Sequence, residues 1–368
     1  FPILNIDLQM SRQDAFDKAT TLSGLINIGP SDYNQAATFG SDNEAQNYIE
    51  LDAGGSKAFI EMLEKDIYKA YTWKVRHYKE NQINEAWFVF SPEGELYGFE
   101  EKLSEDLFLE SLSGKKARKL AESESAETCN IDFTLFELIE ESEDIKTSER
   151  LDRTFVYKRN DYSIGEEGEY RLKLVVSGNK LTAVEHYVKV PETFNRKYEE
   201  MRSFNNTIAS IANYGLLIFY VLGGIVAGLF ILNRQKWLLW KTAIYWALFI
   251  SVVQVISGLN FLPLSWLGYD TAVSTQNFLL QQILYSLIGG IVDFILVLLS
   301  FVAAESLSRK AFPDHVQFWK LWSGKNPYTS EVAGQTMGGY LLIGLDFPNS
   351  CCIYARTTGA VSSGLKVK

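Results

Sequence analysis

The sequence predicts an α+β region, built from two repeats of a helix and an antiparallel meander, followed by an all-α transmembrane region. Two observations carry this prediction. Residues 1–206 hold 25 Lys and Arg against 39 Asp and Glu, and they contain alternating, strand-like segments. Residues 207–368 hold 10 basic and 6 acidic residues and contain three long apolar runs. The chain of 368 residues therefore joins two unlike halves.

The first predicted repeat opens with a helix at Ser11, where Ser11 serves as the N-cap and Asp14 occupies the third helical position. A meander of strands follows, because runs of apolar and β-branched residues are separated by turn residues such as Pro92-Glu-Gly94. The predicted strands are Thr72–Tyr78, Glu85–Ser91 and Leu96–Lys102.

The second predicted repeat opens about a hundred residues later. Ser113, Ala117 and Ala121 repeat the spacing of Ser11, Ala15 and Ala19, which indicates a second helix of the same kind. Its predicted strands are Thr154–Lys158, Tyr170–Ser177 and Leu181–Val190. Polar and apolar residues alternate clearly after Tyr170, as in a sheet with one solvated face.

A helix followed by an antiparallel meander resembles the PepSY-like modules of secreted and membrane-tethered bacterial proteins. The resemblance rests on the pattern of elements, and it implies a binding or regulatory role. A purely structural spacer is the alternative.

Three apolar runs of the second half predict membrane spans, at Ile208–Leu232, Trp237–Leu259 and Phe278–Ala304. Each run exceeds the roughly 20 residues that cross a bilayer core. Lys241 lies near the end of the second run, where its ammonium group reaches the headgroups.

Short loops set the predicted orientation. The loop after the first span carries Arg234, Lys236 and Lys241, whereas residues 260–277 contain no Lys or Arg. The positive-inside rule therefore places the first loop and the basic segment after the third span in the cytoplasm. We expect a multi-pass protein of the bacterial plasma (inner) membrane with residues 1–206 extracytoplasmic.

The chain divides into four predicted segments. They are the first α+β repeat at 1–104, the second at 105–206, the transmembrane helices within 207–345 with a cytoplasmic segment at 305–335, and an atypical polar tail at 346–368. The chain opens on Phe1-Pro2 without a visible signal peptide, so we expect a fragment of a longer protein.

Composition excludes several functions. The acidic half argues against nucleic-acid binding, which needs clustered positive charge. Three cysteines exclude a disulfide framework, and three histidines without paired spacing form no zinc pattern. We interpret His77 and His186 as sheet residues, Cys129 as a small core residue, and Glu166-Glu167-Gly-Glu-Tyr-Arg171 as a solvated charge cluster.

A second resemblance concerns the segment Ala303-Ala-Glu-Ser-Leu-Ser-Arg-Lys-Ala-Phe-Pro-Asp-His-Val-Gln-Phe-Trp-Lys-Leu-Trp322 and the segment Gly334-Gln-Thr-Met-Gly-Gly-Tyr340. Both resemble the pre-catalytic region of large bacterial members of the CPBP family, which contains CAAX proteases and bacteriocin-processing enzymes. The resemblance extends to the start of the chain, at residues 1–12, and to Pro191–Thr207. It implies peptide hydrolysis within the membrane by a Glu-Glu-xxx-Arg motif and histidines, in which a paired glutamate activates water.

These family motifs are missing from the predicted spans. Ala304 replaces the first glutamate before Glu305, and Glu305 and Arg309 read as an ion pair four residues apart on one helix. His315 reads as a cytoplasmic loop residue. Asp293 is the one charge within the third span, and an intramembrane carboxylate has either a functional or a pairing role.

The polar tail departs from the family, and its adjacent Cys351 and Cys352 lack metal-binding spacing, although lipidation of the pair stays open. We therefore assign no catalytic, cofactor-binding or metal-ligating residue and expect no cofactor.

The leading hypothesis is a fragment of an intramembrane protease whose Glu-Glu and His site lies downstream of this chain. The alternative is a noncatalytic membrane-anchored binding or sensor protein with paired PepSY-like modules, and a transporter component is a weaker third hypothesis. The expected partners are the lipid bilayer and a peptide or protein substrate, with no nucleic acid.

Overall fold

The protein forms two compact units in the computed structural model, which describes residues 8–313, 329–330, 332–334 and 336–341. The first, here called the sheet unit, comprises Phe1–Tyr198 together with Pro263–Phe278. The second, here called the helical unit, comprises Glu199–Leu262 and Leu279–Lys368. Each unit is described by itself.

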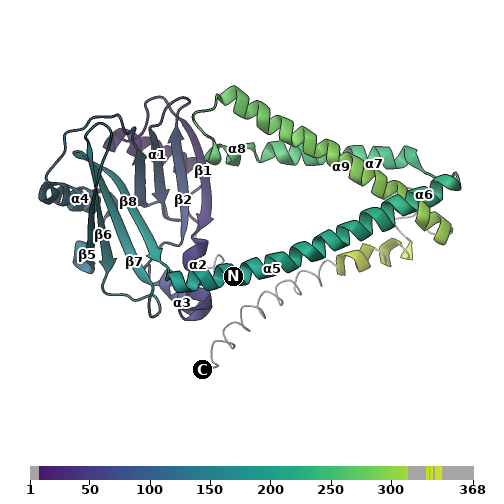
Figure 1. The fold of residues 1–368 in the computed structure, drawn as a ribbon, viewed down its shortest axis with the longest axis horizontal. Helices are drawn as coiled ribbons and strands as arrows, with labels where there is room; N and C mark the ends of the chain where they lie inside the picture. Colours follow the sequence, from purple (N-terminus) through teal and green to yellow (C-terminus); the bar gives the residue numbers. More distant parts are fainter. Residues whose placement is uncertain (1–7, 314–328, 331, 335, 342–368) are drawn as a thin grey trace. The chain divides into compact units, whose positions relative to one another are not determined.

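The sheet unit contains one eight-stranded antiparallel sheet of order β1-β2-β3-β4-β8-β7-β6-β5 (Figure 1). The strands are β1 (Asn34–Ser41), β2 (Tyr71–Tyr78), β3 (Glu85–Phe90), β4 (Leu96–Lys102), β5 (Phe136–Ile145), β6 (Leu151–Arg159), β7 (Glu169–Ser177) and β8 (Lys180–Lys189). The helices before the membrane segments are α1 (Arg12–Ile26), α2 (Asn43–Leu51), α3 (Gly55–Glu64), α4 (Gly114–Cys129) and the 3₁₀ turn η2 (Phe133–Leu135).

The predicted α+β class is confirmed, and all six predicted strands are present. The sequence analysis missed β1, β5 and the helix pair α2–α3. Each half of the sheet opens with a helix and continues as four sequential strands, and the two halves meet where β4 pairs with β8. That the halves are copies of one repeat stays a prediction.

Helices α1 and α4 bury the alanines that the repeated spacing singled out. Ser11 caps α1 through a reciprocal bond with Asp14, as predicted, whereas Ser113 occupies the N-cap of α4 without a side-chain capping bond. Small side chains at four-residue spacing let a helix approach the sheet closely. The fully buried alanines are Ala15 and Ala19 in α1, and Ala117 and Ala121 in α4.

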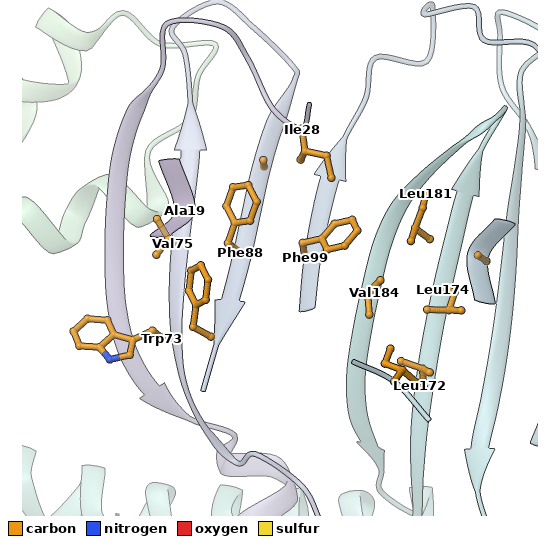
Figure 2. Packing of buried hydrophobic residues seen from close by; sticks show 14 of the residues in the cluster. Ala19, Ile28, Trp73, Val75, Phe88, Phe99, Leu172, Leu174, Leu181 and Val184 are labelled. Atoms are coloured by element: carbon orange, nitrogen blue, oxygen red, sulfur yellow. The ribbon is translucent and has the colours of Figure 1, made fainter. Parts of the chain in front are cut away.

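The principal core lies between these two helices and one face of the sheet. Phe88 and Leu174 are completely buried, and Phe99 faces Val184 across the junction of the two halves (Figure 2). The opposite face, here called the open face, presents the alternate residues of each strand. Because α1 and α4 cover only one face, the open face is free to contact residues 263–278, which pack on Ala36, Arg76 and Tyr78.

The ladder between β4 and β8 is short. It contains two pairs, Phe99 with Val184 and Glu100 with Ala183, whereas nine pairs join β7 and β8. Gly98 lies at this seam so close to the Val184 carbonyl oxygen that an added Cβ would overlap it. The seam is therefore the least extensively paired junction in the sheet.

The helical unit contributes to three helices that are long and apolar enough to cross a membrane, which confirms the predicted membrane protein. They cover Glu192–Arg234, Trp240–Gly268 and Thr275–Ala311. The first and third predicted spans lie within these helices, whereas the second helix begins at Trp240, three residues after the predicted start at Trp237. Their elements are α5 (Glu192–Ile218), the π-helical segment η3 (Phe219–Val226), α6 (Ala227–Arg234), α7 (Trp240–Asn260), α8 (Leu262–Ser265), the 3₁₀ turn η4 (Trp266–Gly268) and α9 (Thr275–Ala311).

Small residues form the contact between α7 and α9. The Ser251 hydroxyl donates to the Gly290 carbonyl oxygen over 2.6 Å. A Cβ at Gly258 would lie 2.9 Å from the Ser286 hydroxyl oxygen, so the backbones approach closely here. This contact is the kind that stabilises helix pairs in lipid, where apolar burial alone gives no drive to associate.

Candidate functional site

A buried arginine on β2 holds the loop that links the second and third apolar helices. Arg76 is 5% exposed, and its Nη1 donates to the carbonyl oxygens of Trp266 (3.2 Å), Leu267 (3.1 Å) and Tyr269 (2.7 Å). The Trp266 and Leu267 carbonyls belong to η4 and the Tyr269 carbonyl follows it, and the Tyr269 amide also donates to the Trp266 carbonyl oxygen. One guanidinium group therefore terminates this turn and fixes it to the open face. We call this arrangement the loop anchor.

The charge of Arg76 is balanced within the sheet. Its Nε donates to Glu85 Oε2 on β3 over 2.7 Å, and both side chains are nearly inaccessible to solvent. The guanidinium carbon lies 4.9 Å from the ring centre of Tyr78 and 5.5 Å from that of Trp87. Removing one member of such a buried pair leaves an uncompensated charge and typically lowers the free energy of unfolding by about 3–5 kcal/mol.

An aromatic cluster seals the loop anchor. Tyr78 and Ala36 of the sheet are buried together with Tyr269 and Phe278 of the loop, and Trp266 packs against them. The Tyr78 ring stacks on Trp266 at 6.1 Å, and Trp266 lies 4.7 Å from Phe278. Burial raises the pKa of Tyr78 to about 12, so its hydroxyl stays neutral.

Hydrogen bonds extend the loop anchor along the turn between β2 and β3. The Asn81 amide donates to the Thr271 carbonyl oxygen, and the Thr271 hydroxyl donates to the Gln82 carbonyl oxygen, both over 2.8 Å. Thr275 donates from its hydroxyl and its amide to Glu80, and these bonds lower the pKa of Glu80. Residues 263–278 are thus a structured part of the sheet unit.

A tyrosine–histidine cluster lies at the seam between the two halves of the sheet. Tyr97 on β4 stacks on His186 on β8 with ring centres 4.3 Å apart. The Tyr170 hydroxyl lies 2.7 Å from His186 Nδ1 and 3.2 Å from the Tyr97 hydroxyl. Tyr68 packs edge-on against Tyr170 and donates to Asp42 Oδ2 over 2.6 Å.

The titratable members of this cluster are neutral at ordinary pH. Burial, with a smaller contribution from the Arg159 charge, lowers the pKa of His186 to about 3. Burial raises the pKa of Tyr170 to about 12 and raises the pKa values of Tyr68 and Tyr97 well above their usual range. Since no member has a pKa near 7, the cluster suits hydrogen bonding to a ligand better than proton transfer.

Two cavities flank the cluster. A groove of about 490 Å³ lies on the open face and is lined by strands β2, β3, β4 and β8, with Trp87 and Tyr187 among its walls. An inner cavity of about 430 Å³ lies near the C-terminal end of α4 and includes Cys129 and Arg159. Tyr97 and His186 line both cavities.

The histidines, the cysteine and the glutamates that the sequence analysis singled out do not lie together in the structure. His77 lies on β2 and is fully buried, whereas His186 lies in the cluster on β8. Cys129 is partly buried against the principal core, and burial raises the pKa of its thiol to about 12, which keeps the thiol protonated at neutral pH. Glu166 and Glu167 are exposed in a turn.

The structure also places the charged residues of α9 that the sequence analysis considered. Glu305 and Arg309 form the predicted ion pair at 2.9 Å. Asp293 is half-buried, and within the described part of the chain it has no hydrogen-bond or ion-pair partner. His315, Cys351 and Cys352 lie outside the described residues.

Sequence reasoning missed Arg76 and the tyrosines of the cluster. A charged residue within the aromatic strand Tyr71–Tyr78, followed by Glu85 at the start of the next strand, is a signal for the ion pair. Nothing in the sequence signals the loop carbonyls that Arg76 also binds, because they lie about 190 residues away.

In comparisons with known proteins, no family model matches the chain, and no curated protein or solved structure matches it.

Proposed function

We propose that the chain is a membrane-anchored binding or sensor protein in which the sheet unit passes the state of a ligand site to the membrane helices. The loop anchor is the observation that supports this proposal. A spacer needs only a tether such as α5, whereas Arg76 fixes a second point of the sheet to the loop between α7 and α9. The two halves of the sheet act in this proposal as paired PepSY-like modules.

The proposed orientation places the sheet unit outside the cytoplasm of a bacterial cell. It is supported by the basic loop after the first span and by the absence of Lys and Arg from residues 260–277. The contact of residues 263–278 with the sheet agrees with it, because both must then share one side of the membrane. Reporter fusions after residue 200 and after residue 320 should report opposite sides, and the same side for both would contradict the orientation.

Hydrogen exchange of the whole protein in detergent micelles tests the sensor proposal. Arg76→Gln removes the cation and leaves Glu85 buried without it, so we expect residues 263–278 to exchange at least tenfold faster. Lys102→Gln is the matched control, because Lys102 is an exposed cation on β4. Unchanged exchange of the loop in Arg76→Gln would contradict the proposal that this residue couples the sheet to the helices.

A second candidate is an intramembrane peptidase of the CPBP type whose catalytic Glu-Glu and His site lies downstream of this chain. Its support is the resemblance of Ala303–Trp322 and Gly334–Tyr340 to that family. The described membrane helices carry no histidine, and their adjacent glutamates, Glu199 and Glu200, lie before the apolar stretch that begins at Ile208 and are not followed by the arginine of the motif, so this candidate requires further helices. Translating the DNA past Gly339 in all three frames tests it. A Glu-Glu-xxx-Arg motif on an apolar helix supports the peptidase, and its absence in every frame opposes it.

The second candidate also predicts that this chain alone cleaves no peptide. The purified chain in detergent should be inactive, whereas a parent with the downstream helices should hydrolyse peptide bonds. Cleavage by this chain that disappears in Asp293→Asn or Glu305→Gln would place the active site within the present helices and contradict the proposal.

A further inference from the structure

We propose that the groove on the open face binds a short zwitterionic peptide, of about three residues, with its free carboxylate at Lys74 and its free ammonium group at Glu100. This inference rests on the proposed sensor function and names the chemical class of its ligand.

The floor of the groove is formed by residues with little side chain. Gly98 on β4 and Ala183 on β8 line it at the seam, next to Val89 on β3. The Val184 carbonyl oxygen of β8 occupies the place of a Gly98 side chain, so the floor is flat here, while neighbouring positions on the open face carry longer side chains. The flat floor between these side chains suits the backbone and small apolar parts of a ligand.

Two charges on the groove wall are unneutralised. Lys74 and Glu100 are exposed, and neither makes an ion pair or side-chain hydrogen bond within the described part of the chain. The other charges that line the groove are engaged elsewhere. Lys69 pairs with Asp66, Glu185 pairs with Lys173, and Asp42 accepts bonds from Tyr68 and from the amide of Ala45 at the start of α2.

One free cation and one free anion complement a ligand with both charges. A simple anion would meet Glu100, and a simple cation would meet Lys74, so either alone satisfies half of the site. Lys74 on β2 pairs with Val89 on β3, and Val89 pairs with Gly98 on β4. Glu100 lies two residues beyond Gly98 on the same strand. Two strand spacings and two residues separate their Cα atoms by about 12 Å. An extended tripeptide spans about 10 Å between its ends, so the long Lys74 and Glu100 side chains must lean outward by about 2 Å each to contact both ends.

Trp87 links this groove to the loop anchor. It lines the groove and faces Glu100 directly across the ladder, while its ring lies 5.5 Å from the Arg76 guanidinium carbon. A peptide side chain packed on Trp87 therefore touches the residue that contacts the loop-holding arginine. Occupation of the groove thereby stabilises the loop anchor and slows the exchange of residues 263–278.

Isothermal titration of the whole protein in detergent with trileucine tests the site. We expect saturable binding of trileucine and at least tenfold weaker binding of its N-acetylated, C-amidated form, which lacks both charges. Val89→Trp fills the floor between Lys74 and Glu100 and should weaken binding at least tenfold. Thr154→Trp adds the same side chain to the open face on β6, outside the groove, and should leave binding within twofold of the original.

Two further variants assign the ends of the peptide. Lys74→Ala should bind trileucine and trileucine amide equally, because the partner of the carboxylate is gone. Glu100→Ala should likewise lose the preference for a free amino terminus over an acetylated one. Retention of both preferences in these variants would overturn the assigned ends.

The outcomes separate this site from the sensor proposal. No binding of trileucine, or equal binding of the blocked peptide, overturns the peptide site even if Arg76→Gln opens the loop as expected. Binding that depends on Val89 without slower exchange of residues 263–278 supports the peptide site and overturns its link to the loop anchor.

Discussion

Acidification should destabilise the sheet unit through His77, a buried histidine on β2. The side chain is 0% exposed, stacks on Tyr33 with ring centres 3.9 Å apart, and packs edge-on against Phe88. Its Nε2 lies 2.8 Å from the Gln35 amide nitrogen, and its Nδ1 is buried without a hydrogen-bond partner in the described part of the chain. Burial lowers the pKa of His77 to about 4, because the cation would lose its hydration.

The sign and size of the effect follow from proton linkage. The pKa of His77 in the folded chain lies below the unfolded value of 6.5, so the unfolded chain binds the proton first as the pH falls. Stability is therefore lost between about pH 6.5 and pH 4. Between pH 7 and pH 5 this single group reduces the free energy of unfolding by about 2 kcal/mol.

This loss can be measured by chemical denaturation of the whole protein in detergent. The circular dichroism signal of the strands reports the fraction of protein that is unfolded. His77→Gln keeps an acceptor for Gln35 and cannot titrate, so its loss of stability between pH 7 and pH 5 should be smaller by about 2 kcal/mol. The comparison removes the contribution of His186 and the carboxylates, which both proteins share. Equal losses in the two proteins would refute the reasoning that burial holds His77 neutral.

Three further predictions concern packing and reactivity. Ala19→Leu should destabilise the sheet unit by about 1–3 kcal/mol in the same assay, because its position is completely buried, whereas Leu at the exposed Thr20 should change little. Gly290→Ala should lower the thermal stability of the membrane helices, because its Cβ would overlap Val255, and Gly289→Ala, with open space around it, should not. With Cys351 and Cys352 replaced by serine, Cys129 should react with maleimide at pH 8 more slowly in the native than in the unfolded protein; equal rates would contradict the raised pKa of its thiol.

The elements that sequence predicted are those whose pattern repeats along the chain. The spacing of Ser11, Ala15 and Ala19 predicts a helix because the buried stripe and the N-cap are both local features. The apolar runs predict membrane helices for the same reason. By contrast β5 is an edge strand with mostly exposed, acidic residues, so it lacks the alternation that marks a half-buried strand.

The candidate site could be predicted only in part, because its parts come from distant segments. The strands that carry Arg76 and Glu85 were expected, yet the loop carbonyls that complete the anchor have no sequence signal. The groove likewise depends on Gly98 and Ala183 meeting at the β4–β8 seam. Pairing between the last strands of two halves is a long-range event, and turn residues and periodicity report only on neighbours in the chain.

The docked loop also imposes an order of events on the synthesis of the protein. About 190 residues separate Arg76 from the carbonyls that it binds. At translation rates of about 5–20 residues per second, some 10–40 s pass before the loop exists. During that interval Tyr78 and the Arg76–Glu85 pair face the surroundings without their cover and are open to chaperones or to wrong contacts. The strands of the sheet end at Lys189, whereas the open face is covered at Arg76 only when residues 263–278 reach it, so docking of this loop is a later step than formation of the sheet itself.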